Sequence, residues 1–236
     1  MIVKMLKDIL DLLFPPRCIA CSKPGQEIIC GECLRQINYL KPLICSVCGK
    51  PKDRYFQGAL CEDCSKNKPA FTLARSVALY EGVLKEAIHK YKFNCKKGLS
   101  DPLGRLIAEH LKGSDIPIRD IDIVIPIPLS RQRERERGYN QSMLLAEVVS
   151  REFQVKLDVT SLKKIKDIKP QFELARAERL VNIKGAFVSC EISNLNVLVI
   201  DDIYTTGATV SEAVSALKVA GAKNVYVLTL ARAVED

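Results

Sequence analysis

Short apolar runs alternate with longer amphipathic stretches after residue 70 of this chain. The short runs are rich in Val and Ile and predict buried strands, whereas the longer stretches have the spacing of helices. Because strands that alternate with helices pair side by side, this order predicts an α/β domain, a parallel sheet with helices on both faces. The predicted strands are 121–127, 197–201 and 225–230, and the predicted helices are 103–111, 142–153 and 209–220.

The first fourteen residues have a different pattern. Apolar residues from Ile2 to Phe14 recur at helical spacing, and Pro15 and Pro16 end the stretch. The segment is too short to span a bilayer and too charged for a secretory signal, so we expect a cytoplasmic chain. Its charges are balanced, which favours a helix packed on its own protein. Docking of residues 1–14 on a membrane surface is the alternative.

Cysteine usage divides the chain into two parts. Eight of the ten cysteines lie between residues 18 and 64 of the 236-residue chain. We therefore predict a small N-terminal domain over residues 1–68 and a larger domain over residues 69–236. The 47% hydrophobic and 27% charged residues are close to the average for globular proteins, which excludes a disordered or fibrous chain.

The eight cysteines form four C-x-x-C pairs, the pattern of two tetrahedral zinc sites with four thiolates each. A disulfide framework is the alternative, but it is disfavoured in a chain without an export signal. Four thiolates leave no open position for substrate, so both ions are expected to be structural. Sequential pairing of the C-x-x-C units keeps the loops short, but cross-braced pairing also fits the spacing. The expected zinc ligands are Cys18, Cys21, Cys30, Cys33, Cys45, Cys48, Cys61 and Cys64.

Residues 197–210 contain the strongest candidate for a binding site. An apolar strand ends in Asp201 and Asp202, and a loop with three hydroxyl residues and Gly207 then begins a helix. Free backbone N–H groups and a helix N-terminus at this edge of a parallel sheet favour a phosphate. A simple capped helix would need only one threonine and would not explain the two acids. Ribose hydroxyls or a bound Mg²⁺ would supply their partner.

This segment resembles the PRPP-binding signature of the type I phosphoribosyltransferases, with four apolar residues, two acids and a Thr-Thr-Gly-x-Thr loop. The resemblance implies that Asp201 and Asp202 hold the ribose hydroxyls of PRPP, which arrives with magnesium. It also implies that the loop holds the 5′-phosphate. The loop residues are Thr205, Thr206, Gly207, Ala208 and Thr209.

A second segment, residues 125–142, resembles the ComF family of competence-associated proteins. Four arginines alternate there with two glutamates, and at strand spacing the arginines would share one face. A solvated surface run is an equal alternative. We favour a functional role for Arg137, because the following Gly138 permits close backbone approach. In related transferases the loop after this strand faces pyrophosphate.

A third segment, residues 162–187, also resembles the ComF family, although Lys163, Lys164 and Lys166 stand where arginines are expected and Ile168 where threonine is expected. Lysine keeps the charge but loses bidentate geometry. The basic character suggests either a lid over pyrophosphate or a path for a nucleic-acid backbone, with a solvated helix as the alternative. The residues that carry the resemblance are Pro170, Gln171, Leu174, Arg176, Arg179, Asn182, Gly185, Ala186 and Phe187.

Two functions follow from these motifs. The first is a PRPP-dependent phosphoribosyltransferase with an unknown acceptor, acting in DNA uptake, natural competence or the use of DNA-derived nucleotides as the ComF resemblance implies. The second is a non-catalytic protein that senses PRPP or a nucleotide and binds single-stranded DNA, together with other DNA-uptake proteins. No Ser/His/Asp or Cys/His set indicates a catalytic residue. Scattered aromatic residues argue against a base-stacking platform.

The net charge of +8 suggests anionic partners. Each zinc ion with four thiolates carries a net charge of about −2, so two sites reduce the total to about +4. Residues 1–68 contain 11 basic and 7 acidic residues, and the two zinc sites cancel this positive excess. The net positive charge of the protein therefore lies in residues 69–236. A local excess of this kind suits pyrophosphate at least as well as nucleic acid.

Overall fold

A five-stranded parallel sheet forms the centre of the computed structural model, which describes residues 17–52, 58–93, 96–166 and 183–234. The strand order is β1-β7-β6-β2-β3, so β6 lies between β7 and β2. The parallel pairing confirms the predicted α/β fold. The strands are β1 (Leu73–Leu79), β2 (Ile123–Pro126), β3 (Lys156–Leu157), β6 (Asn196–Tyr204) and β7 (Asn224–Arg232).

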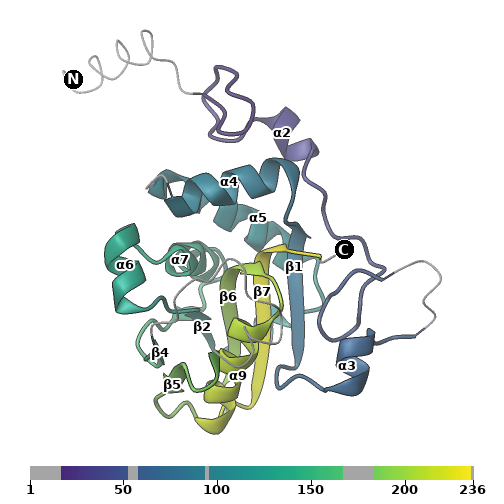
Figure 1. Cartoon of the computed structure of the whole chain (residues 1–236), viewed down its shortest axis with the longest axis vertical. Coiled ribbons are helices and arrows are strands. Elements are labelled where there is room, and N and C mark those ends of the chain that lie inside the picture. Colours follow the sequence, from purple (N-terminus) through teal and green to yellow (C-terminus); the bar gives the residue numbers. More distant parts are fainter. Residues whose placement is uncertain (1–16, 53–57, 94–95, 167–182, 235–236) are drawn as a thin grey trace.

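Helices cover both faces of this sheet (Figure 1). The long helices are α4 (Gly82–Phe93), α5 (Ser100–Lys112), α7 (Gln141–Phe153) and α9 (Ala208–Val219). Short helices are α2 (Gly31–Arg35), α3 (Glu62–Lys66) and α6 (Arg131–Arg137), with 3₁₀ turns at Lys97–Leu99 and Ile118–Asp120.

Alternate residues of β6 explain the two layers. Leu198 and Ile200 pack with α4, α5 and α7, whereas Val197 and Val199 pack with α9. Successive side chains of a strand point to opposite faces, so a continuous apolar run is buried on both sides. This run is the signal that made the strand predictable from sequence.

A two-stranded antiparallel sheet stands apart from the main sheet. It pairs β4 (Leu162–Lys164) with β5 (Phe187–Ser189). These strands bound the basic segment in which a lid is predicted, but residues 167–182 lie outside the described residues. The predicted lid therefore stays a prediction, as does the N-terminal helix over residues 1–14.

The two cysteine-rich units pack against different parts of the larger domain. The first lies against α4, and the second lies with α3 beside β1 (Figure 1). Cys18 and Cys33 share a hydrophobic cluster with α4, whereas Cys45 and Cys48 share the cluster that contains α9. The division at residue 68 is untested and stays a prediction.

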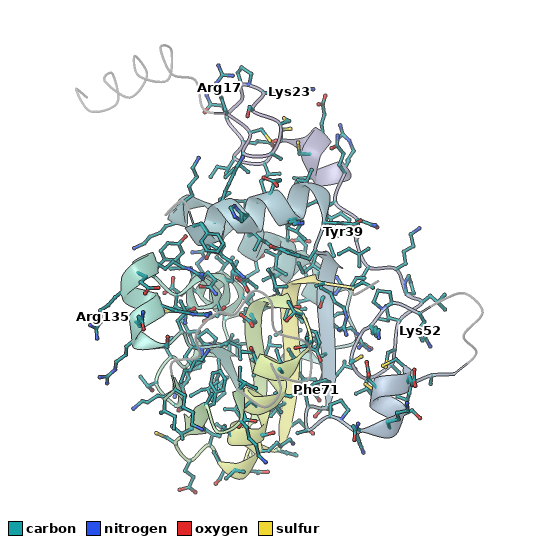
Figure 2. All side chains as sticks on the ribbon, viewed as in Figure 1. Arg17, Lys23, Tyr39, Lys52, Phe71 and Arg135 are labelled. Carbon is teal, nitrogen blue, oxygen red and sulfur yellow. The ribbon has the colours of Figure 1, made fainter. Side chains whose placement is uncertain are left out.

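The sequence prediction for the arginine run is wrong in its geometry. Residues Arg131–Arg137 form the helix α6, so alternate arginines do not share one face. Arg135, for example, projects from α6 away from the sheet (Figure 2). Gln132 Nε2 donates to Glu136 Oε1 at 2.8 Å across one helical turn, a pairing that stabilises helix rather than strand. No helix in the described ranges is long and apolar enough to cross a bilayer.

Candidate phosphate site and zinc centres

The loop between β6 and α9 has the geometry of an anion site. Gly207, the N-cap of α9, has a φ of +77°, and a Cβ at this position would overlap the Tyr204 ring, 2.6 Å from Cζ. Only glycine therefore fits this close approach. Within the described residues the backbone N–H groups of Thr205, Thr206 and Gly207 donate to no other group. They are available, beside a helix N-terminus, for an anionic ligand.

The predicted acid pair lies near the carboxyl end of β6, two residues before this loop. Asp201 and Asp202 are buried, with 7% and 3% of their surfaces exposed. Ile200 and Ile203 are three residues apart but both pack in the hydrophobic cluster beneath α4. The alternation of side chains between the two faces of the sheet is therefore broken at the two acids between them. The described strand continues to Tyr204, three residues beyond its predicted end.

Each acid has a partner from a different helix. Ser142 Oγ, in the first turn of α7, donates to Asp201 Oδ1 at 2.7 Å. Lys92 Nζ, near the end of α4, lies 2.8 Å from Asp202 Oδ2 in an ion pair whose side chains are 18% and 5% exposed. The structure thus brings the ends of α4, α7 and β6 together around two carboxylates.

Burial and, second to it, the negative charge of Asp202 raise the pKa of Asp201 to about 7, against the opposing hydrogen bond from Ser142. The folded protein therefore holds the Asp201 proton more tightly than the unfolded chain does. The contribution of this group to stability is present at low pH and is lost as the pH rises through about 7. Shifted pKa values of buried carboxylates cluster at functional sites.

The segment after α6 holds this cluster together. Asn140 caps α7, its Oδ1 accepting from Ser142 N at 3.0 Å, while its Nδ2 donates to Ile127 O at 3.0 Å. Gly138 has a φ of +78° and ends α6, with open space where a Cβ would stand. The left-handed turn, and not a close backbone approach, is therefore what glycine provides here.

Arg137 belongs to the same neighbourhood. Its Nη1 donates to Gln141 Oε1, and its guanidinium lies 5.6 Å from the centre of the exposed Phe93 ring. Gln141 directly precedes Ser142, so the predicted Arg137 is joined to the acid pair through α7. A contact of Arg137 with pyrophosphate is untested and stays a prediction.

Sequence reasoning gave no role to Lys92 or Ser142. Ser142 ends a segment that resembles the ComF family, but neither residue is near Asp201 in sequence, and a lone lysine or serine has no spacing signal. Only the packing of α4 and α7 on one face of the sheet brings them to the acids.

A basic cavity of about 510 Å³ lies next to this cluster, between the segment that follows β2 and strand β4. Since β2 and β6 are hydrogen-bonded neighbours, Pro128 and Ser130 follow β2 at the same edge of the sheet as Asp201. Arg131 and Lys163 line the cavity, and neither has an ion pair within the described ranges. Lys164 and Lys166 add positive charge, and Glu134 is an acidic residue of the lining.

The cysteines of both predicted zinc centres come together in the structure, with sequential pairing of the C-x-x-C units. Cys18, Cys21, Cys30 and Cys33 form one group and Cys45, Cys48, Cys61 and Cys64 the other; within each group the sulfur atoms lie within 4.8 Å of one another. Four sulfurs bound to one zinc ion at about 2.3 Å lie about 3.8 Å apart. The Cys21–Cys30 and Cys48–Cys61 sulfurs are 3.8 Å and 3.6 Å apart, so the donors fit zinc.

Hydrogen bonds from backbone N–H groups favour the thiolate form of one cysteine in each group. Burial raises the pKa of Cys18, but N–H groups of Cys21, Cys30 and Ala20 outweigh it and lower the pKa to about 6. Cys45 has the same balance, and its pKa is also lowered to about 6. Burial and neighbouring cysteines raise the pKa of Cys33 to about 12 and also raise that of Cys64. A divalent cation removes this repulsion, as a structural zinc ion does.

Comparison with known protein families agrees with both halves of this description. Residues 9–65 match the model of a double zinc ribbon domain, and residues 140–236 match that of a phosphoribosyl transferase domain. The chain is therefore a zinc-ribbon protein with a phosphoribosyltransferase fold and two four-cysteine zinc sites.

Relatives that match nearly end to end define the family. The chain is 30% identical over 231 residues to DNA utilization protein YhgH of Escherichia coli O6:H1, covering 94% of this chain and 99% of that protein. It is 29% identical to Competence protein F of Haemophilus influenzae, covering 92% of this chain and 97% of that protein. Competence protein ComFC of Bacillus subtilis is also 29% identical, with 92% and 88% covered. The chain belongs to this ComF family.

Proposed function

We propose that this protein binds PRPP and transfers its phosphoribosyl group to an acceptor. The observation that carries the proposal is the juxtaposition of three available N–H groups at Thr205–Gly207 with the buried acid pair at the end of the same strand. The N–H groups and the N-terminus of α9, from Ala208 and Thr209, hold the 5′-phosphate. Asp201 and Asp202 accept hydrogen bonds from the ribose hydroxyls.

Magnesium enters this site with PRPP. Mg²⁺ keeps oxygen ligands and is commonly bound by substrate phosphates with one or two carboxylates. Asp202 already has the positive charge of Lys92 beside it, and Asp201 has the hydroxyl of Ser142. The two acids therefore suit hydroxyl donors, and the phosphate oxygens of PRPP would be the main ligands of the ion. When bound, the ion would supply positive charge that stabilises the pyrophosphate leaving group.

The reaction that this arrangement supports is displacement at C1 of the ribose. A nucleophilic atom of the acceptor bonds to C1 while the bond from C1 to the pyrophosphate oxygen breaks. Pyrophosphate leaves with the bonding electrons, and the proton of the acceptor passes to solvent. The protein positions the ribose and stabilises charge, so no protein nucleophile is required. Arg137 and the cations beside β4 are the groups that would face pyrophosphate.

Isothermal titration with PRPP and Mg²⁺, followed by a pyrophosphate-release assay, tests this function. We expect binding of PRPP and release of pyrophosphate only when an acceptor is present. A panel of free bases, amines and single-stranded oligonucleotides is offered as acceptor, with buffer alone as the control for hydrolysis. If the wild-type protein fails to bind PRPP, the proposal is wrong. PRPP binding with no acceptor used would instead identify a PRPP-sensing protein.

We further propose that this activity serves the handling of DNA in the cytoplasm, where reduced thiols persist as both zinc sites require. The names of the YhgH and competence relatives support this role, and so does the basic cavity beside the site. Contacts of Arg131 and Lys163 with the phosphate backbone of DNA would make the affinity for single-stranded DNA fall steeply as the salt concentration rises. A salt titration of a labelled oligonucleotide tests this, with Arg131→Gln/Lys163→Gln compared with Lys223→Gln on the opposite edge of the sheet. No retention of the oligonucleotide at low salt would exclude direct DNA contact.

The pH dependence of ligand binding follows from the raised pKa of Asp201. A ribose hydroxyl donates well only to the ionised carboxylate, so affinity for ribose 5-phosphate is expected to rise about tenfold from about pH 6 to about pH 8. The phosphate itself has a second pKa near 6 and adds to the rise at the acidic end. Titration calorimetry across this range measures the effect. The Asp201→Asn variant should keep only the part of the pH dependence that comes from the phosphate. If its pH profile is the same as that of the wild type, the assignment is contradicted.

A further inference from the structure

Arg232 is a buried arginine between two parts of the molecule. One is the second zinc ribbon, which contains Cys45, Cys48, Cys61 and Cys64, and the other is the phosphate loop at Thr205–Thr209. Arg232 is the last residue of β7, has 6% of its surface exposed, and pairs in register with Tyr204 at the end of β6. Its guanidinium lies 4.3 Å from the centre of the Tyr204 ring. From the same guanidinium, Nη1 donates to Cys48 O at 2.7 Å and Nη2 lies 3.8 Å from Cys48 Sγ.

The charge of Arg232 has no carboxylate partner within the described residues. A buried cation is costly unless an anion compensates it. The second group of cysteines supplies that anion, since zinc with four thiolates carries a net charge of about −2. Cys48 is one of these ligands, and all four cysteines of the group are buried. Arg232 is therefore held in place by the loaded zinc site.

The Tyr204 ring also contacts the phosphate loop. The Tyr204 ring, on which Arg232 stacks, fills the space beside Gly207 so closely that no Cβ could be placed there. Tyr204 is itself buried, with 6% of its surface exposed. The position of the ring therefore limits the positions open to Gly207 and to the N–H groups around it, because buried contacts of this density leave little room for movement.

We propose that Arg232 is a positioning residue that couples zinc occupancy of the second ribbon to phosphate binding by the loop at Thr205–Thr209. This inference rests on the proposed function, because the loop must bind a phosphate for the coupling to exist. With zinc bound, the thiolates hold Arg232, Arg232 holds the Tyr204 ring, and the ring holds Gly207 in its left-handed conformation. The coupling is reciprocal, so a phosphate ligand also strengthens retention of zinc.

Two measurements on the full chain test the coupling. Titration calorimetry compares ribose 5-phosphate binding to the wild type, Arg232→Met and Arg75→Met, each with its zinc content determined. Arg75 is the matched control, since it is equally buried and its Nη2 donates to Ser46 O of the same ribbon at 3.0 Å, but Asp115 is its partner. We expect about a tenfold loss of affinity in Arg232→Met and less than a twofold change in Arg75→Met.

The second measurement is the rate of zinc release from the wild-type protein to a colorimetric chelator, and it needs no variant. Saturating ribose 5-phosphate should slow the release of one of the two zinc equivalents severalfold. An equal rate with and without ligand overturns the coupling, as does equal affinity in Arg232→Met and the wild type. If both arginine variants lose affinity alike, general loosening of the ribbon is the cause and the proposed path is wrong. If the wild type binds no ribose 5-phosphate at all, the proposed function has failed instead.

Discussion

Removal of both zinc ions is expected to lower the melting temperature of the protein by about 10 °C or more. The cysteines of the second site belong to the hydrophobic cluster that also contains α9 and one face of the sheet. Without the cation, four buried thiols repel one another as they ionise, and structural zinc contributes folding free energy directly. In a chain of this size each kcal/mol lost lowers the melting temperature by about 2–4 °C.

Differential scanning calorimetry with metal analysis, before and after chelation, measures this effect. The purified protein should contain close to two zinc equivalents. Cys48→Ser should lower the melting temperature more than Cys21→Ser, because Cys48 is buried whereas Cys21 is exposed. Cys190→Ser is the matched control, since this exposed cysteine lies outside both groups, and no change is expected. Protein without zinc and with all thiols free would contradict the assignment.

Replacement of both acids, in Asp201→Asn/Asp202→Asn, is expected to lower the affinity for PRPP by about a hundredfold or more. Hydrogen bonds to a charged acceptor contribute about 1.5–3 kcal/mol each, and two such acceptors are weakened at once. The amide side chains have the same shape, so Ser142 and the backbone of Asp202 keep acceptors for their hydrogen bonds. The variant loses the repulsion between two buried carboxylates but also the ion pair of Asp202 with Lys92, so these two effects offset each other and its melting temperature should change little.

Titration calorimetry with PRPP and Mg²⁺ measures this loss. Asp122→Asn is the matched control, because Asp122 precedes β2 and accepts from Asn196 N at 2.7 Å, at the opposite end of β6 from the loop. Its affinity should lie within twofold of the wild type. Undiminished PRPP binding by the double variant would show that the ribose lies elsewhere.

The strongest local signals in the sequence were reliable guides to structure. The predicted helices at 142–153 and 209–220 correspond to α7 and α9 within one residue at each end. Long periodic stretches bury one face, and their pattern is therefore explicit. The strand β1 and the helix α4 were not predicted. In β1, the polar residues Arg75 and Ser76 lie within the buried run and interrupt its apolar pattern.

The arginine run shows where a pattern misleads. Alternation of Arg and Glu has the period of a strand, but both residues are good helix formers, and no apolar face forces an extended conformation. Within a helix, Gln132 and Glu136 meet one turn apart. Propensity and local hydrogen bonding outweigh period when no side of the segment is buried.

The sequence by itself determined the chemistry of this protein: eight thiols in four C-x-x-C units, two acids at the end of an apolar strand, and a glycine-containing loop that leads into a helix. These signals lie in contiguous residues, so spacing alone identifies them. The tertiary structure decided which C-x-x-C units pair, and that Lys92, Ser142 and Arg232 serve the acids and the loop. The contacts of Lys92, Ser142 and Arg232 join residues that are distant in sequence, and only the packing of helices and ribbon on the sheet brings them together.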